Sequence, residues 1–154
     1  MNYRTLILVT VFMSAAVGVS AGSPFFPSSP DSWFAMLNSD LDEATAAIGG
    51  AWEEIPPGEY SSRADRIVFY PEGLTLWAIG GKIIQLRIDS IWAGEIGGIR
   101  AGETEEVLRK VMGVPWIEET DSLYYNLPWN EGPVRLRFVF TGNGLHEVYL
   151  YKVR

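Results

Sequence analysis

The stretch SDLDEATAAIGGAW at residues 39–52 has a counterpart of the same length, ETEEVLRKVMGVPW, at residues 103–116. Each stretch opens with polar and acidic residues, continues with helix-forming residues, and places a glycine three positions before a tryptophan, Gly49 before Trp52 and Gly113 before Trp116. Three strand-like runs follow each stretch. An internal repeat indicates the architecture of a chain before any single motif does. We therefore expect an α+β fold made of two tandem helix-plus-antiparallel-meander units, with the helices packed on one face of the sheet.

The strands are expected from alternating and β-branched runs bounded by turn residues. In the first unit these runs cover residues 66–70, 74–79 and 82–88, and in the second unit they cover residues 123–127, 134–140 and 145–152. Gly80-Gly81 and Thr141-Gly142-Asn143-Gly144 are typical of hairpin turns. Residues 53–64 and 118–121 are rich in proline, glycine or charge and are expected to be loops.

Capping signals place the main helix of each unit. Ser39 is expected to cap the first helix, with Asp42 three residues later completing a variant of the capping box. Thr104 is expected to cap the second helix, and acidic residues in its first turn suit the helix dipole. The buried stripe of the second helix is expected to consist of Val107, Leu108, Val111 and Met112.

The strand pattern predicts one apolar sheet face for the helices and a second face rich in arginine and aromatic residues. Arginine, tryptophan and tyrosine dominate the hot spots of protein interfaces. The same residue types are also ordinary cross-strand partners on an exposed sheet. Our candidate partner-binding residues on this second face are Trp77, Arg87, Arg135, Arg137, Tyr149 and Tyr151.

The first 21 residues have the features of a secretory signal peptide. Arg4 precedes an apolar stretch over residues 6–19, and Val19-Ser20-Ala21 forms a small-residue cleavage signal. An uncleaved anchor is the alternative, although the stretch is shorter than the ~20 residues of a spanning helix. We expect cleavage after Ala21, a first unit with an N-terminal arm at residues 22–92, a second unit at residues 93–154, and a secreted or periplasmic location.

The composition of the chain limits the classes of partner that it can bind. The formal net charge is −7, and it becomes −8 when Arg4 leaves with the leader. Nucleic-acid binding needs clustered Lys and Arg, so an acidic chain is a poor candidate for it. We expect no nucleic-acid partner and no stable membrane insertion after cleavage. The expected partner is another exported or envelope protein.

The chain offers no convergent catalytic set. His146 is the only histidine, and its strand pattern places it on one face with Val148 and Leu150, as a partly buried structural residue. One histidine and no cysteine exclude the usual zinc sites. Glu118, Glu119 and Asp121 are expected to be solvated loop carboxylates rather than a glycosidase pair. We expect no enzymatic activity, no cofactor and no metal.

The second half also carries a wider pattern. It comprises residues 98–107, Met112-Gly113-Val114-Pro115, Tyr124-Tyr125, residues 137–140 and Gly144-Leu145. This pattern resembles β-lactamase-inhibitor-protein-like domains, a group that includes the SmpA/OmlA lipoproteins of the β-barrel assembly machinery. The resemblance implies tandem units with helices on one sheet face, and protein binding through the sheet surface and its loops. It assigns a role to no single residue.

These observations favour an exported, non-enzymatic protein-binding module, either inhibitor-like or an envelope assembly factor. A small-ligand carrier is the alternative, with the ligand held between the sheet and an arm that contains Phe25 and Phe26. A hydrolase is the third possibility and would depend on the carboxylates at Glu118 and Glu119.

Overall fold

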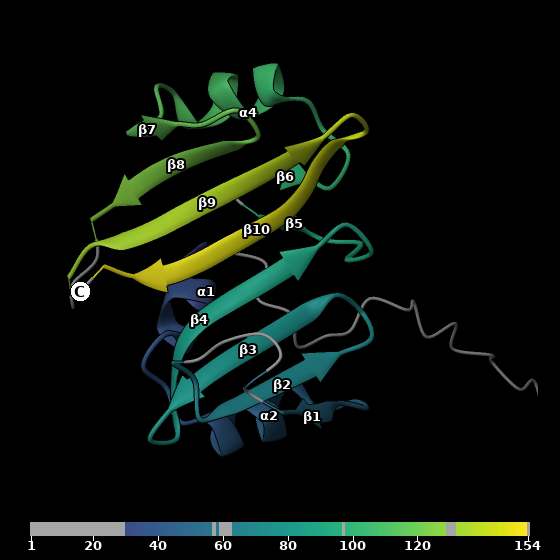
Figure 1. Ribbon diagram of the computed structural model, residues 1–154, viewed down its shortest axis with the longest axis vertical. Coiled ribbons are helices and arrows are strands. Elements are labelled where there is room, and N and C mark those ends of the chain that lie inside the picture. Colours follow the sequence, from purple (N-terminus) through teal and green to yellow (C-terminus); the bar gives the residue numbers. More distant parts are fainter. Residues whose placement is uncertain (1–29, 57, 59–62, 97, 129–131, 154) are drawn as a thin grey trace, which may run out of the picture.

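The computed structural model describes residues 30–153 except 57, 59–62, 97 and 129–131 (Figure 1). The expected signal peptide and the arm with Phe25 and Phe26 lie outside the described residues. The described part of the chain is an α+β fold with three helices, one eight-stranded antiparallel sheet and a separate two-stranded hairpin. The α+β class is therefore confirmed.

The eight strands join into one sheet in the order β1-β2-β3-β4-β10-β9-β8-β7. Strands β4 and β10 pair antiparallel at the centre, where Leu86 lies opposite Leu150 and Ile88 lies opposite Val148. The hairpin consists of β5 (Glu95–Ile96) and β6 (Ile99–Arg100). The strands of the large sheet are β1 (Glu53–Ile55), β2 (Arg66–Tyr70), β3 (Leu74–Ile79), β4 (Lys82–Asp89), β7 (Ile117–Glu118), β8 (Ser122–Leu127), β9 (Val134–Thr141) and β10 (Gly144–Lys152).

All six expected strands are present, with ends within one residue of the expected positions. The expected loops at residues 53–64 and 118–121 are wrong in part, because β1 and β7 begin or end inside them. These edge strands are two or three residues long, which is too short for an alternating pattern to be recognised. The hairpin β5–β6 was missed for the same reason.

The helices are α1 (Pro30–Met36), α2 (Leu41–Ile48) and α4 (Glu105–Met112). Helix α4 is capped by Thr104 as expected, through its bond from the Val107 N–H. The expected Ser39 cap of α2 is wrong. The Asp40 side chain accepts the N–H groups of Asp42 and Glu43, whereas the Ser39 hydroxyl donates to the Met36 carbonyl.

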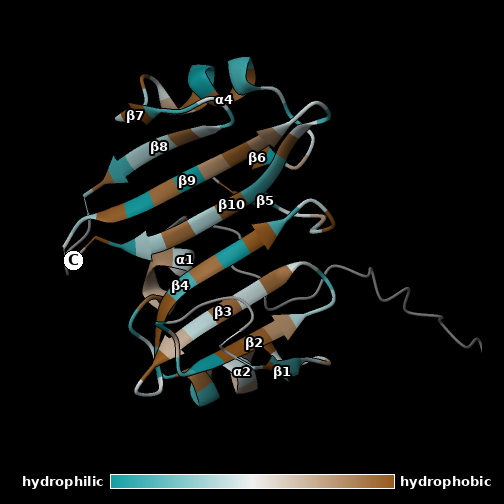
Figure 2. Cartoon of the chain, viewed as in Figure 1, coloured by the Kyte–Doolittle hydropathy of each residue, from teal (hydrophilic) through white to brown (hydrophobic). Residues whose placement is uncertain are grey.

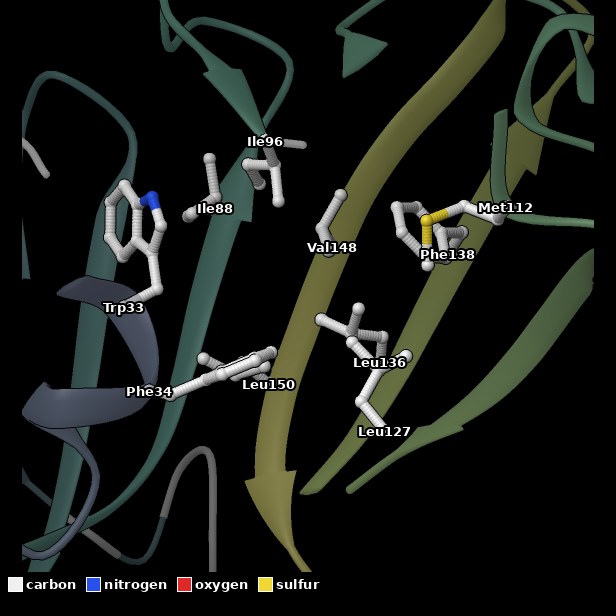
Figure 3. A pocket seen from close by; sticks show the side chains of 10 residues that line it. All are labelled: Trp33, Phe34, Ile88, Ile96, Met112, Leu127, Leu136, Phe138, Val148 and Leu150. Atoms are coloured by element: carbon white, nitrogen blue, oxygen red, sulfur yellow. The ribbon is translucent and has the colours of Figure 1, made fainter. Parts of the chain in front are cut away.

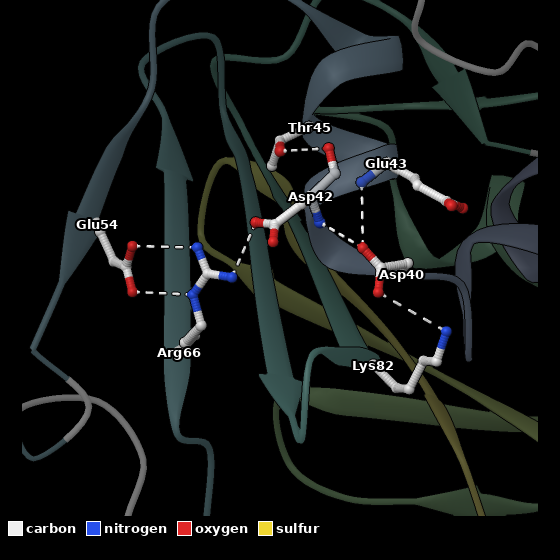
Figure 4. A network of polar contacts seen from close by, with 7 residues as sticks. All are labelled: Asp40, Asp42, Glu43, Thr45, Glu54, Arg66 and Lys82. Atoms are coloured by element: carbon white, nitrogen blue, oxygen red, sulfur yellow. Dashed lines mark hydrogen bonds and ion pairs between the residues drawn. The ribbon is translucent and has the colours of Figure 1, made fainter.

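Ion pairs fix α2 against the edge of the sheet (Figure 4). The Arg66 guanidinium of β2 lies 2.8 Å from the Asp42 carboxylate of α2 and 3.1 Å from the Glu54 carboxylate of β1. These two acceptors raise the pKa of Arg66, with the hydrogen bonds to Glu54 and Asp42 as the main causes. Lys82 and Asp40 form a looser pair at 3.8 Å.

The main core lies between the helices and one face of the sheet. Figure 2 shows hydrophobic and hydrophilic residues alternating along β4 and β9, as the sequence pattern predicts. The helices contribute Trp33, Leu41 and Leu108 to this core, each at most 2% exposed. The principal sheet residues of the same cluster are Val68, Tyr70, Leu74, Leu76, Ile83, Leu86, Leu123, Tyr125, Val134, Leu136, Phe138, Val148 and Leu150.

Two irregularities interrupt the alternation of the strands. The register between β3 and β4 shifts after Trp77, so Ile83 joins the main core and Ile84 packs on the opposite face. A second shift in β10 lies between Leu145 and Glu147. This bulge leaves His146 exposed, so the expectation of a partly buried histidine beside Val148 and Leu150 is wrong.

The expected stripe of α4 is also wrong in part. Leu108 is fully buried and Met112 packs against the core, but Val107 is 37% exposed and Val111 is 50% exposed. Helix α4 therefore contacts the sheet through a narrow line of residues and turns an apolar face outwards.

Candidate partner-binding face

The sheet face opposite the helices carries an ordered array of arginine and aromatic side chains over β4, β10, β9 and β8. Antiparallel register sets these residues side by side, because directly opposed residues point to the same face. One row runs Arg87, Tyr149, Arg137 and Tyr124. A second row places Tyr151 opposite Arg135. We call these six residues the arginine–aromatic face.

Each arginine of this face lies against aromatic rings. The Arg137 guanidinium carbon is 5.6 Å from the ring centre of Tyr124 and 5.8 Å from that of Tyr149. The Arg135 guanidinium carbon lies 4.4 Å from the ring centre of Trp116 and 6.0 Å from that of Tyr151. Such cation–π contacts each contribute about 0.5–1 kcal/mol at exposed sites. They hold the guanidinium groups in place without neutralising them.

The charge of Arg87, which lies at the centre of the sheet, is compensated by a carboxylate. Its guanidinium lies 3.6 Å from the Glu147 carboxylate and donates to the Thr75 hydroxyl at 3.3 Å. The Tyr149 hydroxyl donates to the same Glu147 carboxylate at 2.7 Å. Burial is the largest cause that raises the pKa of Tyr149, and this bond to Glu147 adds to it. Tyr149 therefore stays neutral at physiological pH.

Arg135 and Arg137 are not compensated in this way. Arg135 donates to the Asn126 side-chain carbonyl at 3.0 Å, and Arg137 donates to the Ser122 hydroxyl at 3.0 Å. Within the described part of the chain, neither guanidinium forms an ion pair with a carboxylate. The face thus presents two oriented cations in a chain whose formal net charge is −7.

Trp77 does not belong to this exposed surface, which corrects one expectation. It is only 6% exposed and forms a small second core with Ala64 and Ile67, against which Ile55 and Ile84 pack. Its ring centre lies 5.9 Å from the Arg87 guanidinium carbon. Trp77 thus lies beside Arg87 at one end of the array, on the same sheet face. The other five predicted residues are half-buried and lie together on the open face.

Tyr124 and Trp116 belong to the site but were missed from the sequence. Tyr124 could have been found, because β8 alternates and Tyr124 falls on the face opposite Leu123 and Tyr125. Trp116 has no strand pattern around it that would assign it to a sheet face. Trp116 is 56% exposed and its ring lies against Arg135, although the residue lies outside the strands.

The acidic residues considered for catalysis have structural partners. Glu118 forms an ion pair with Arg109 at 2.7 Å, and Glu119 accepts the Tyr124 hydroxyl at 2.9 Å. The Asp121 carboxylate accepts the Ser122 hydroxyl. Among the described residues there is no group of three His, Cys, Asp or Glu residues suited to a metal ion. The helices described are too short and too polar to cross a membrane.

An apolar cavity lies on the helix side of the sheet (Figure 3). Its volume is about 50 Å³. Trp33 and Phe34 of α1 face Met112 of α4 across the sheet residues, as Figure 3 shows. The remaining lining residues are Ile88, Ile96, Leu127, Leu136, Phe138, Val148 and Leu150.

Comparison of the chain with protein-family models, with characterised proteins and with solved structures finds no match.

Proposed function

We propose that this protein is an exported, non-enzymatic binding module that engages another exported or envelope protein through the arginine–aromatic face. The observation that carries the proposal is the pair Arg135 and Arg137, both stacked on aromatic rings and neither paired with a carboxylate of the described residues. Arg66 and Arg109 show the ordinary structural role of a surface arginine, because each forms ion pairs with carboxylates of the same chain. Arg135 and Arg137 differ from them in this respect.

The physical state of these side chains favours binding. Immobilising a flexible side chain at an interface costs about 0.5–1.5 kcal/mol. Arg137 is already held by the Ser122 hydroxyl and two rings, so less of this cost remains when a partner arrives. Tyrosine and arginine are also the residue types in which interface energy is concentrated.

We also propose that the fold consists of two tandem units, as the resemblance to β-lactamase-inhibitor-protein-like and SmpA/OmlA domains implies. Three features support this. The strand order runs β1 to β4 and then β10 back to β7, so each strand has a counterpart at the same distance from the centre. Helices α2 and α4 are both eight residues long, and both end at a glycine of positive φ, Gly49 and Gly113. The families that the sequence resembles include inhibitors and envelope assembly factors, and either function is compatible with two tandem units.

The test is capture of a partner from native envelope and culture-fluid extracts by tagged mature protein. The variant is Arg135→Ala/Arg137→Ala/Tyr149→Ala. Trp77 is left unchanged because its burial makes its removal a test of stability instead. The control is Lys82→Ala/Arg100→Ala, which removes the same positive charge away from the face. Lys82 and Arg100 are both exposed and each has its own carboxylate partner.

We expect a protein captured by the unmodified chain and by the control, and lost from the triple variant while its circular dichroism and melting temperature stay close to those of the control. Equal capture by the triple variant would reject the face as the binding surface. A hydrolytic activity sensitive to Glu118→Gln or Glu119→Gln would reject the non-enzymatic reading.

A small-ligand carrier is the second candidate, because an apolar cavity lies on the helix side of the sheet. The cavity volume of about 50 Å³ is far below the ~300–1,000 Å³ of typical ligand pockets. The described cavity therefore suits only a few non-hydrogen atoms. Native mass spectrometry separates the two candidates, because a carrier retains a co-purified ligand and a binding module gives the mass of the polypeptide alone.

A further inference from the structure

Exposed apolar side chains are concentrated at one end of the sheet. The described residues include seven large hydrophobic side chains that are well exposed, and five of them lie within residues 107–117. They project from α4, from the connection that follows it and from β7. We call them the α4–β7 patch: Val107 (37% exposed), Val111 (50%), Val114 (92%), Trp116 (56%) and Ile117 (37%).

The patch is held in place by specific contacts. Arg109 of α4 forms ion pairs with Glu105 one turn earlier and with Glu118 of β7. The Tyr125 hydroxyl donates to the Gly113 carbonyl at 3.1 Å, and the Trp116 N–H donates to the Tyr124 carbonyl at 2.7 Å. Helix, connection and edge strand are therefore joined to one another and to β8.

The exposure is not a requirement of the fold. Helix α2 has the same length as α4 and buries Leu41, Ala44 and Ile48, while its outer positions Ala46 and Ala47 are alanines. Helix α4 instead has β-branched valines at the outer positions 107 and 111, which are one turn apart and share a helix face. Valine is a weaker helix former than alanine and gains nothing from water contact, so a binding role explains its presence better than helix stability does.

Charge around the patch selects the kind of partner. Four exposed glutamates, Glu105, Glu106, Glu118 and Glu119, border the patch and outnumber its two cations, Arg109 and the exposed Lys110. A second copy of this chain would bring the same acidic border and the same net charge of −7, which opposes self-association. A partner with basic residues next to its apolar side chains would meet attraction at the same border.

We propose that the α4–β7 patch is a second docking surface, which adjoins the arginine–aromatic face at Trp116 and Ile117, and that it takes an amphipathic protein segment whose apolar side chains are flanked by Lys or Arg. Val111 and Val114 supply the centre of the apolar contact. Trp116 lies where the patch meets Arg135, so a partner bound there would also touch the edge of the arginine–aromatic face.

The test uses two synthetic helical peptides with the same leucine face, one flanked by lysines and the other by glutamates. Each is titrated into ¹⁵N-labelled full-length mature protein, and amide shifts are followed by NMR. The variant Val111→Ser/Val114→Ser keeps the charge and removes apolar area. The control Ala46→Ser/Ala47→Ser places the same number of exposed serines on α2.

We expect saturable shifts at residues 107–117 with the lysine-flanked peptide, and at least tenfold weaker binding of the glutamate-flanked peptide. The Val111→Ser/Val114→Ser variant should bind at least tenfold more weakly than the control, and added salt should weaken binding. Equal binding of both peptides, or no saturable shift at residues 107–117, would overturn the proposal. Shifts confined to the arginine–aromatic face would overturn it while leaving the proposed function intact. Sedimentation showing self-association that the variant abolishes would assign the patch to a second copy and equally overturn it.

Discussion

Tyr70 lies in the core at 1% exposure, and its hydroxyl has no hydrogen-bond partner among the described residues. Burial raises the pKa of Tyr70 to about 12, and the nearby charge of Glu72 adds to the effect. A buried hydroxyl without a partner costs free energy in the folded state, because it gives up its bonds to water. The aromatic ring therefore carries the contribution of this residue to stability.

We predict that Tyr70→Phe leaves the free energy of unfolding unchanged or raises it at pH 7, and changes its pH dependence. Because the folded pKa is higher than the ordinary value near 10, the contribution is complete below pH 10 and is lost as pH rises towards 12. The unmodified protein should lose about 2–3 kcal/mol over this range through Tyr70. Urea unfolding at pH 8 and pH 11 measures the difference, and an equal loss in Tyr70→Phe would contradict the assignment.

Gly144 is a second position where a single side-chain atom affects the stability of the fold. It has φ of 97°, and a side-chain carbon placed there would meet the Gly102 carbonyl, which is backbone that cannot turn away. We predict that Gly144→Ala lowers the free energy of unfolding by about 1–3 kcal/mol, from the disfavoured backbone conformation and the clash. Gly142, in the same turn, has open space around it, so Gly142→Ala is the control and should stay within about 0.5 kcal/mol. Thermal unfolding of the two variants compares them, and equal melting temperatures would refute the argument.

At the scale of the element, the start of α2 shows what a capping pattern can and cannot predict. The sequence correctly predicts a helix that begins near residue 40, but the expected cap, Ser39, is one residue away from the observed cap, Asp40. The bond between the Asn38 N–H and the Ile83 carbonyl and that between the Ile83 N–H and the Ser39 carbonyl tie this segment to β4. Those distant contacts give Asp40 the capping position.

We predict that Asp40→Ala lowers the free energy of unfolding by about 0.5–2 kcal/mol, because two N–H groups of α2 lose their acceptor. Asp40→Asn keeps a side-chain oxygen and removes only the 3.8 Å ion pair with Lys82, so it should retain most of the stability. Denaturant unfolding of the two variants is the measurement. A loss in Asp40→Asn as large as in Asp40→Ala would mean that charge, and not capping, is what matters.

Bulges explain the largest errors made from the sequence at this scale. A single extra residue reverses the inward and outward positions that follow it. The bulge at Leu145/Glu147 therefore moved His146 away from its expected face, and the bulge at Trp77/Ala78 interrupts the alternation of β4 at Ile84. Long alternating strands such as β9 carry enough pattern to be placed correctly, whereas a bulge depends on contacts between strands that are distant in sequence.

At the scale of the whole molecule, the central pair β4–β10 makes one sheet from the two proposed units. The main core contains residues from both sides of this pair, including Leu76 of β3 and Phe138 of β9. The sequence predicted the composition of the open face but could not show that Arg87 and Tyr149 would be neighbours. That adjacency is created by the pairing of β4 with β10, whose register is set by long-range packing.

Because both halves of the sheet share one core, we predict that a destabilising substitution in one half also lowers the stability of the other half. Phe138 packs edge-on against Tyr125, with ring centres 5.8 Å apart. Phe138→Leu should lower the opening free energy of the slowest-exchanging amides in β3 and β9 by the same amount, on the order of 1 kcal/mol. Native-state hydrogen exchange measures both strands at once. Loss of protection in β9 alone would show that the two units open independently.

The arginine–aromatic face is the central claim, and site-specific photo-crosslinking tests it most directly. A photoreactive amino acid would replace exposed Asn126, next to Arg135 on the open face, and in a parallel sample exposed Ala46 on α2, on the opposite side of the sheet. With native extract present, we predict a discrete crosslinked protein from position 126 and none from position 46. A crosslink from position 46 alone would place the binding surface on the helices and contradict the account.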